Sequence, residues 1–269
     1  MDDTPMCGPP PVTVLIAAHD RLPLLRQSLK SALAQDYPCF KVLVIDDGSG
    51  KETRDWLQRM TWENHRLRVL HQPHQGVANS RQNGLLATTT PLVCILDSDD
   101  LLQPHTLSRI CEEFENKPEI DCVYVDNVIR TPGGREKRRR YPRYSTSHEM
   151  LKATLLRPRI PFKHSGTTFR REVGLSVGGY DRSLPMKIDI DLFLKFLAAG
   201  KVPTLISEPL VIFRMHRDSI SAARWRGIRV WWHLVAQYGP RQPMKRICYQ
   251  LRRTFMELLK MIYSHVFLR

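Results

Sequence analysis

The sequence predicts an α/β fold in which helices cover both faces of a largely parallel sheet. Short apolar runs rich in Val, Ile and Leu recur through the first half of the chain, and a segment with apolar side chains at helical spacing follows most of them. Strands that alternate with helices are typical of parallel sheets, because each parallel connection needs a crossover. With 269 residues, 42% of them hydrophobic, the chain can bury the core of one large domain with an appendage.

The elements are expected in a regular order. The run VTVLIAA opens it as a strand, and the leucines of the following LPLLRQSLKSALAQ fall at helical spacing. The runs FKVLVID, LRVLHQ, LVCILD and DCVYVD repeat the strand pattern. We therefore expect strands at 12–18, 40–46, 67–72, 92–97 and 121–126, and helices at 22–35, 51–60, about 77–86 and about 104–114.

The stretch LVCILDSDDLL (92–102) takes a buried strand directly into three carboxylates. Like charges so close together raise each other's pKa or need a cation. Oxygen ligands from one or two carboxylates, completed by water and a substrate phosphate, usually hold Mg²⁺ or Mn²⁺. The alternative is a polar turn in which Asp99 or Asp100 caps the helix expected near Pro104.

Other polar residues follow the first two expected strands. In a doubly wound sheet, ligands bind outside the carboxyl ends of the strands, so all these side chains should face one crevice. A nucleotide could lie there, with a metal bridging its phosphates, because the chain has neither of the glycine-rich phosphate loops GxxxxGK[ST] and GxGxxG. The residues concerned are His19, Asp20, Asp46, Asp47, Asp97 and Asp99.

The net charge of +14 and the pI near 9.8 favour an anionic partner, which could be nucleic acid, a membrane surface or a phosphorylated substrate. The cations concentrate at 130–143, an expected exposed loop, and after Ser221. In the second region an apolar stripe at helical spacing is interleaved with cations, which predicts a basic amphipathic helix. The stripe is Ile247, Leu251, Phe255, Leu258, Ile262 and Val266, and the cations are Lys245, Arg246, Arg252, Arg253 and Lys260.

Such a helix can lie in a membrane interface, where Trp225, Trp231 and Trp232 would also be favoured. The alternative is that the stripe packs on the main domain. Every apolar run is shorter than the roughly 20 residues of a membrane span. The six cysteines form no CxxC pair, and the start MDDTPMCGPPP lacks the features of a signal peptide, so we expect reduced thiols and a cytoplasmic protein.

Seven short motifs occur in an order that resembles family 2 glycosyltransferases of the GT-A fold, over roughly residues 12–221. They are AAHDR at 17–21, VIDDGS at 44–49, QGVANSRQNG at 75–84, LDSDD at 96–100, VGGYD at 177–181, DIDLFLK at 189–195 and FRMHRDSIS at 213–221. The resemblance implies a Rossmann-like mixed or parallel sheet with helices on both faces. It also implies an inverting transfer from a nucleotide-sugar, most often a UDP-sugar.

The resemblance carries roles to particular residues. Asp47, with Asp46 beside it, would contact the base, and Arg81 would reach toward the nucleotide. Asp97, Ser98 and Asp99 form the DXD motif, with Asp97 near the ribose and metal and Asp99 as direct ligand of Mn²⁺ or Mg²⁺. His216 matches a histidine that approaches the metal or diphosphate in some members, and Asp189 takes the place of the general base.

Two departures from the family pattern stand out. Ile188 precedes Asp189 where the family usually has a glutamate, and Ala17, Ala18 and His19 replace the usual residues after the first strand. The donor contact there would be rebuilt through the backbone of Ala17 or through His19.

Simpler interpretations of the same residues stay open. Asp46 and Asp47 could cap the helix after Gly50, Asp189 and Asp191 could complement a helix dipole, and Arg81 and His216 could be ordinary solvated or structural residues.

We expect a catalytic domain at 1–221, with a donor half at about 12–127 and an acceptor half at about 128–221, and a basic helical extension at 222–269. The cations at 135–143 and 157–171 suit a phosphorylated or lipid-linked acceptor. The expected function is synthesis of surface polysaccharide or lipopolysaccharide at the inner face of the cell membrane, against its anionic surface and without nucleic acid. Two alternatives are a nucleotidyltransferase or similar nucleotide-sugar enzyme, and a basic nucleic-acid-binding protein.

Overall fold

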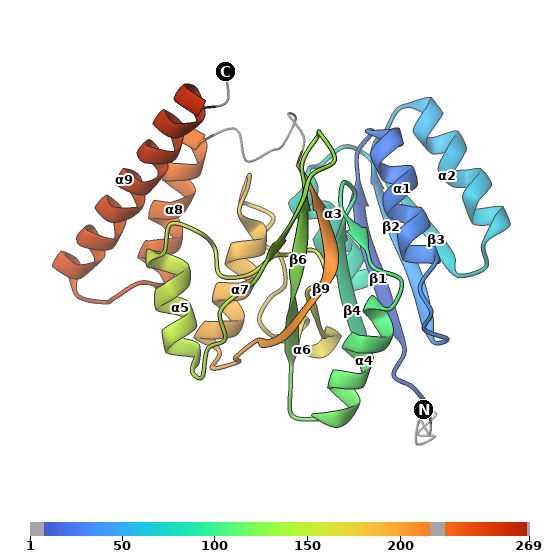
Figure 1. Ribbon diagram of the computed structural model, residues 1–269, viewed down its shortest axis with the longest axis horizontal. Helices are drawn as coiled ribbons and strands as arrows, with labels where there is room; N and C mark the ends of the chain where they lie inside the picture. Colours follow the sequence, from blue (N-terminus) through green and yellow to red (C-terminus); the bar gives the residue numbers. More distant parts are fainter. Residues whose placement is uncertain (1–7, 216–223, 268–269) are drawn as a thin grey trace.

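A mixed sheet forms the centre of the molecule in the computed structural model, which describes residues 8–215 and 224–267 (Figure 1). Four parallel strands make its first half, in the spatial order β3-β2-β1-β4. Their bounds are β1 Val12–Ala18, β2 Phe40–Asp47, β3 Leu67–Gln72 and β4 Leu92–Asp97. These four strands confirm the prediction to within one residue. β1 and β4 are continuous apolar runs that are buried on both faces, whereas β3 is a partly exposed edge strand.

Helices cover both faces of this half, as predicted. They are α1 Leu22–Leu33, α2 Lys51–Glu63, α3 Val77–Ala87 and α4 Thr106–Asn116. Side chains alternate along β1, so that Val14 and Ile16 pack in one hydrophobic cluster with Leu25 and Leu29 of α1, and Leu15 packs in a second cluster on the other face. The α/β prediction is therefore confirmed.

The second half of the sheet is mixed. The three-residue strand β8 Thr168–Arg170 lies antiparallel between β4 and β6 Cys122–Arg130, and β9 Thr204–Arg214 then pairs parallel with β6. The edge strand β5 Leu101–Leu102 pairs with β9. The basic stretch expected as an exposed loop is instead a hairpin, in which β7 Glu136–Arg139 pairs with β6 and the turn lies at Gly133 and Gly134.

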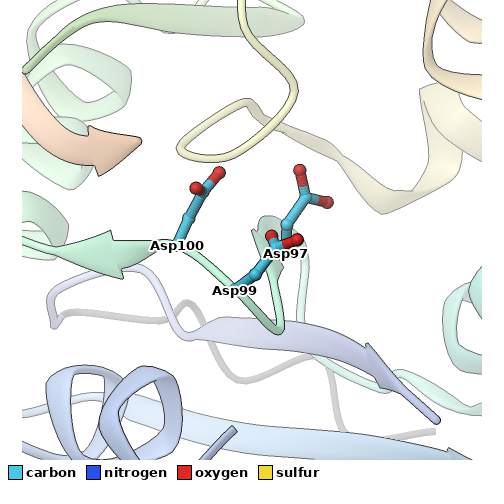
Figure 2. Close-up of side chains that lie close together, drawn as sticks. All are labelled: Asp97, Asp99 and Asp100. Atoms are coloured by element: carbon cyan, nitrogen blue, oxygen red, sulfur yellow. The ribbon is translucent and has the colours of Figure 1, made fainter. Parts of the chain in front are cut away.

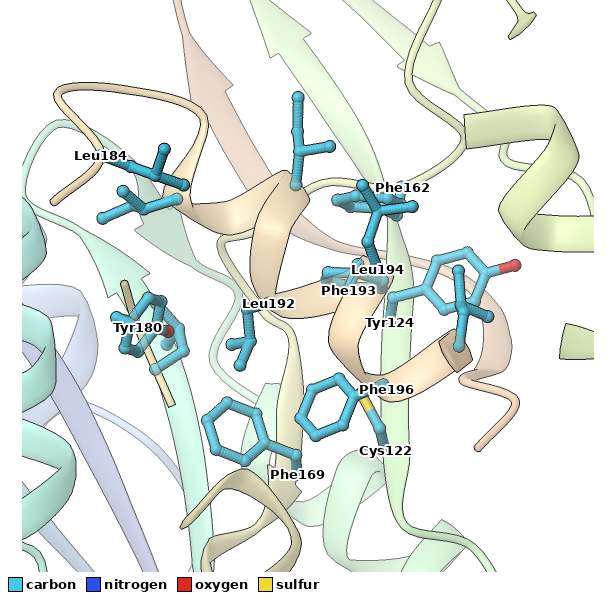
Figure 3. Close-up of a cluster of buried hydrophobic side chains, with 14 of the residues drawn as sticks. Cys122, Tyr124, Phe162, Phe169, Tyr180, Leu184, Leu192, Phe193, Leu194 and Phe196 are labelled. Carbon is cyan, nitrogen blue, oxygen red and sulfur yellow. The ribbon is translucent and has the colours of Figure 1, made fainter. Parts of the chain in front are cut away.

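Three helices of the second half pack on one face of the sheet: α5 Ser147–Leu156, α6 Arg171–Ser176 and α7 Ile188–Ala198. The sequence of α7 is almost wholly apolar after Asp191, because the helix is buried among β6, α5 and the C-terminal helices. Phe193 of α7 stacks on Phe162 with 3.5 Å between ring centroids and lies edge-on to Tyr124 of β6 (Figure 3).

The C-terminal extension consists of two helices at one end of the molecule, α8 Arg224–Tyr238 and α9 Pro243–Phe267 (Figure 1). Trp231, Leu234 and Val235 of α8 belong to the same buried cluster as α7. Tyr238 donates a hydrogen bond of 2.7 Å to the buried Asp191, whose other oxygen lies 2.9 Å from Lys195 Nζ. No helix in the described part of the chain combines the length and apolar character that a membrane crossing needs.

The loop before β8 approaches the end of β4 very closely. Gly166 donates to the carbonyl of Ile95 over 2.7 Å, and its φ of +81° is one that residues with a Cβ rarely adopt. A Cβ there would lie 2.6 Å from Val211 Cγ2 and 2.7 Å from Val125 Cγ2. The packing therefore requires glycine at this position.

We expect Gly166→Ala to lower the free energy of unfolding by about 2–4 kcal/mol, through the strained φ and the two valine contacts. Urea unfolding measures the change. Gly133→Ala is the matched control, because a Cβ at Gly133 meets nothing within 4 Å. Equal stability of the two variants would contradict this account of the packing.

Candidate active site

The carboxyl ends of β1, β2 and β4 bring the expected acids to one edge of the sheet. In β1, Ala17 lies between Ile45 of β2 and Asp97 of β4, and Ala18 lies beside Asp46. This register follows from the three apolar runs, since a shift would expose their buried side chains. The structure thus places Ala17, Asp46 and Asp97 at the same level, as the sequence predicted.

Three carboxylates crowd the turn after β4. Oxygens of Asp97, Asp99 and Asp100 all lie within 4.8 Å of one another (Figure 2). The capping alternative for Asp99 and Asp100 is wrong, because α4 begins at Thr106 and its N-cap residue, His105, makes no side-chain cap. The turn instead leads into β5, so these acids need another source of compensation for their charge.

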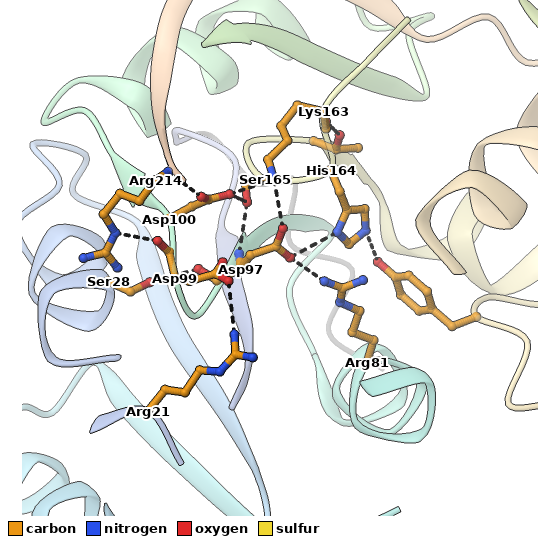
Figure 4. Close-up of polar contacts among 12 residues, drawn as sticks. Arg21, Ser28, Arg81, Asp97, Asp99, Asp100, Lys163, His164, Ser165 and Arg214 are labelled. Atoms are coloured by element: carbon orange, nitrogen blue, oxygen red, sulfur yellow. Dashed lines mark hydrogen bonds and ion pairs between the residues drawn. The ribbon is translucent and has the colours of Figure 1, made fainter. Parts of the chain in front are cut away.

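Cations from distant parts of the chain supply that compensation (Figure 4). Arg81 of α3 pairs with Oδ1 of Asp97. Lys163 Nζ lies 3.4 Å from Oδ2 of Asp97 and 3.0 Å from Oδ2 of Asp100. Arg21 lies 3.6 Å from Oδ2 of Asp99.

These ion pairs shift the titration of the groups involved. Burial opposes ionisation of Asp97, but Arg81 and Lys163 outweigh it and hold the pKa of Asp97 well below its usual value. At Asp100 burial prevails over Lys163 and raises the pKa to about 6. Burial would lower the pKa of Lys163, yet Asp100 and Asp97 raise it, so this lysine is a permanent charge in the site.

Asp100 has a structural role that the other two acids do not share. It is fully buried, accepts a 2.6 Å hydrogen bond from Ser165 Oγ and a 3.2 Å bond from the backbone N–H of Arg214. It therefore ties the turn to β9. Asp97 and Asp99 remain partly exposed, and hard carboxylate oxygens of this kind fit Mg²⁺ or Mn²⁺.

A buried histidine and tyrosine adjoin Asp97. His164 Nε2 lies 2.9 Å from the Tyr180 hydroxyl, and its Nδ1 lies 3.5 Å from Oδ1 of Asp97. Burial, together with Arg81, lowers the pKa of His164. The sequence analysis did not single out Lys163, His164 or Tyr180, although all lie in segments it quoted, 157–171 and VGGYD.

The first two acids have different surroundings. Asp46 is buried, accepts from the backbone N–H of Ser49 and lies 2.8 Å from His71 Nδ1. Asp46 therefore holds the turn at Ser49, but the alternative that the pair caps the helix after Gly50 is wrong. Neither acid caps the next helix, since α2 begins after Gly50 without a side-chain cap.

Asp47 holds the loop that precedes α3. Its Oδ1 accepts from Gln72 Nε2 and from the N–H of Gln75, and its Oδ2 accepts from the N–H of Gly76 and lies 3.0 Å from His74 Nδ1. Burial opposes ionisation, but the bonds from Gln75, Gln72 and Gly76 lower the pKa of Asp47 overall. Three hydrogen bonds and the nearby His74 ring thus surround this carboxylate.

Two histidines stack beside Asp47. The rings of His19 and His74 have centroids 4.0 Å apart, and both Nδ1 atoms lie within 3.0 Å of the Asp47 carbonyl oxygen. Both side chains are exposed, at 44% and 59% respectively. They present an aromatic surface at the edge of the sheet.

The structure also brings Asp189 to this region, in the first turn of α7. Burial tends to lower the pKa of Arg81, but Asp97, Tyr180 and Asp189 together raise it, so the charge of Asp189 acts on the same cluster. Asp191, two residues on, points instead into the interior toward Tyr238. His216 lies outside the described residues.

The fold and the site define an α/β protein in which carboxylates with oxygens of the kind that suit a divalent cation lie beside two partly buried cations. The sequence model of Glycosyl transferase family 2 matches residues 13–175, and the chain belongs to this family. It is therefore a glycosyltransferase, and the nucleotidyltransferase alternative is set aside.

Relatives with assigned names are similar over most of this chain. The hyaluronan synthase of Pasteurella multocida is 24% identical over 201 residues, which are 75% of this chain and 20% of that protein. The O-antigen biosynthesis protein RfbC of Myxococcus xanthus is 28% identical over 226 residues, 81% of this chain and 17% of that protein. The chain thus spans about a fifth of the length of these relatives.

Solved structures show the same fold. TarS 1-349 of S. aureus in complex with UDP-GlcNAc matches 96% of this chain and 76% of its own, with a TM-score of 0.70 and 14% identity. The mannosyltransferase PcManGT of Pyrobaculum calidifontis, in complex with GDP-Man and Mn²⁺, matches 93% of this chain and 70% of its own, with a TM-score of 0.65 and 18% identity. The chain has the GT-A fold.

The hydrogen bonds to Asp47 predict a pH-dependent stability. Because its folded pKa is lowered, the ionised group stabilises the fold above its ordinary pKa of about 3.9, and this contribution is lost as pH falls through the folded pKa. We expect Asp47→Asn to lower the free energy of unfolding at pH 7 by about 1–3 kcal/mol, with a smaller difference below about pH 4.

Urea unfolding across this pH range measures the difference. Asp55→Asn is the control, because Asp55 is an exposed aspartate that pairs with Lys51 on α2. If the difference in free energy of unfolding between Asp47→Asn and the unchanged protein stays constant down to pH 3, the ionised form of Asp47 is not favoured in the folded state.

Proposed function

We propose that this enzyme transfers a hexosyl group, with inversion, from a nucleotide-sugar to a glycan or glycolipid acceptor. A UDP-sugar is the proposed donor. The observation that carries the proposal is the cluster of Asp97, Asp99 and Arg81 at the carboxyl end of β4, with Asp189 near enough to raise the pKa of Arg81. TarS in complex with UDP-GlcNAc supports the choice of a UDP-sugar, at the level of the shared fold.

The base of the donor would lie at the Asp47 end of the site, with Ala17 and His19 nearby. Three hydrogen bonds hold Asp47, and His74 Nδ1 lies 3.0 Å from Oδ2, so a contact from the base N–H to Oδ2 requires His74 to move. The His74 side chain is exposed. A base that displaced it could stack on the His19 ring and take over its place at Oδ2.

The diphosphate would lie beside the acidic turn, close to the cations that pair with Asp97. Asp97, Ser98 and Asp99, with His216 from outside the described residues, are the proposed ligands and donor contacts, and Mn²⁺ or Mg²⁺ is the proposed metal. Such a cation, when bound, would offset the charge that develops on the leaving diphosphate. Arg81 and Lys163 are placed to contribute positive charge to the same group.

Asp189 is the proposed general base. Inverting transfer needs a carboxylate that takes the proton of the acceptor hydroxyl as this oxygen attacks the anomeric carbon. Asp189 is partly exposed at the start of α7. Ile188 before it is buried and packs in the core, so the usual neighbouring glutamate has no counterpart here.

The proposed process is synthesis of surface polysaccharide or lipopolysaccharide by a peripheral protein on the inner face of the cell membrane. The names of the related hyaluronan synthase and O-antigen protein support a polysaccharide product. We keep the expected division into a catalytic domain at 1–221, with halves at about 12–127 and 128–221, and an extension at 222–269. Nucleic acid has no place in this proposal.

Titration calorimetry with UDP, GDP and dTDP, each with and without Mn²⁺, tests the donor site. We expect UDP to bind most tightly, in a metal-dependent manner, and Asp99→Ala to weaken metal-dependent binding at least tenfold, about 1.4 kcal/mol. Asp55→Ala should bind normally, because this carboxylate pairs with Lys51 on the surface of α2.

If GDP or dTDP binds and UDP does not, the proposed donor class is wrong, but the proposed position of the donor site stands. If neither the removal of Mn²⁺ nor Asp99→Ala changes the nucleotide dissociation constant, the proposed role of the acidic turn in metal binding is wrong.

Asp189→Asn tests the base. We expect the rate of nucleoside diphosphate release in the presence of a bacterial lipid extract to fall about 10²–10⁴-fold. The nucleotide dissociation constant should change less than twofold, because Asp189 is not a proposed donor contact. Asp55→Asn again serves as control. A rate that stays within tenfold of the unchanged enzyme would remove Asp189 from this role.

A further inference from the structure

Helix α9 packs on the molecule with its polar face inward. Arg253 is fully buried, donates to the carbonyl oxygen of Thr154 in α5, and has its Cζ 3.6 Å from the centroid of the Trp231 ring. Glu257, one turn on, is only 6% exposed and pairs with Lys260. Arg253 was expected among the cations that could face acidic lipid, and the structure buries it instead, so this expectation is wrong for Arg253.

The opposite face of α9 is apolar and open. We call it the outer stripe, and it consists of Met244, Ile247, Leu251, Phe255 and Leu259. Their spacing of three or four residues places them on one side of the helix. Nine large hydrophobic side chains are exposed among the described residues, and five of them form this stripe. Leu258 of the predicted apolar set is partly buried, and the side chains of Ile262 and Val266 lie outside the description.

One flank of the outer stripe carries an interfacial aromatic residue. Trp232 of α8 is 43% exposed, and its Nε1 donates to Thr254 Oγ1 over 2.9 Å, which fixes the ring beside α9. Indole rings with one polar end are favoured at the boundary between lipid and water. The ring therefore lies beside the helix that carries the stripe.

Cations occupy the other flank. Lys245 and Arg252 are exposed on α9, and Arg252 Nε donates to the carbonyl oxygen of Leu156, at the end of α5. Arg157 and Arg159 follow there and are exposed too. Over residues 224–269 the sequence has ten Lys and Arg against one carboxylate, Glu257, which is buried.

We infer that the outer stripe of α9 docks on an anionic membrane surface. A helix with a broad apolar face and flanking cations lies in the plane of the interface, with its apolar side chains below the headgroups and its cations against acidic lipid. The stripe extends over about 22 Å, from Met244 to Leu259, which is ample for this mode of binding. A second copy of the chain fits less well, because two such faces would bring like charges together.

This inference deepens the proposed function, since it rests on an acceptor that is held at a membrane. Helices α8 and α9 form one end of the molecule, and α1 and α2 lie at the other (Figure 1). Docking through α9 would therefore bring the half that contains α5 and α7 nearest to the lipid. This is the half proposed to bind the acceptor.

Sedimentation with vesicles of phosphatidylcholine, with or without phosphatidylglycerol, tests the surface on the full chain. We expect binding to the anionic vesicles that salt weakens, and an at least tenfold loss in the double variant Leu251→Gln, Phe255→Gln. Lys245→Gln with Arg252→Gln should reduce the preference for phosphatidylglycerol and its dependence on salt. Trp62→Gln is the control, because Trp62 is 75% exposed on α2, away from the stripe.

On the same preparations, UDP titration shows whether the proposed donor site works, and circular dichroism shows whether each variant is folded. Vesicle binding that is absent from the unchanged protein, or that survives in the stripe variant, overturns the inference even if nucleotide binding is normal. A stripe variant that loses only self-association, by light scattering, also overturns it and indicates a second copy as the occupant. Normal vesicle binding without nucleotide binding would instead count against the proposed function alone.

Discussion

The neutralisation of Asp97 and Asp100 at the end of β4 is the interaction on which the rest of the structure depends. Two carboxylates this close, in a largely buried turn, are tolerable only with cations beside them, because an unpaired buried charge costs several kcal/mol. The chain supplies these cations from well-separated positions, Arg81 in α3 and Lys163 in the loop before β8. The site is therefore also the place where the first and second halves of the sheet are joined.

The same geometry explains why the short strand β8 stands between β4 and β6. Lys163 and Ser165 reach the acids only if the chain returns beside β4, and Gly166 allows that approach by bonding directly to Ile95. Three residues of β8 suffice, because β4 and β6 hold it on both sides. The antiparallel insertion is thus a consequence of bringing a lysine to the acidic turn.

The sequence predicted what depends on local periodicity and little of what depends on distant contacts. The first four strands and four helices were correctly placed, since each has its own apolar pattern, and the acids at their ends followed from the rule for parallel sheets. β8 is too short to show a pattern, and no local signal pairs Lys163 with residues 63 and 66 positions earlier. The sequence did not indicate that the polar face of α9 points inward. A buried Arg253 is favourable only because it contacts the carbonyl of Thr154 and the ring of Trp231, which are distant in the sequence.

The C-terminal helices also bear on the start of α7. Asp189 lies between two residues that α8 contacts: Lys187, whose Nζ is 5.2 Å from the Trp231 ring centroid, and Asp191, which accepts from Tyr238. Lys187 adopts a φ of 61°, an uncommon conformation for a residue with a Cβ, so its surroundings must hold it there. Burial lowers the pKa of Lys187, although Glu257 of α9 opposes this effect. The extension therefore belongs to the framework that orients the first turn of α7, because both residues that flank Ile190 and Asp189 in this turn contact α8.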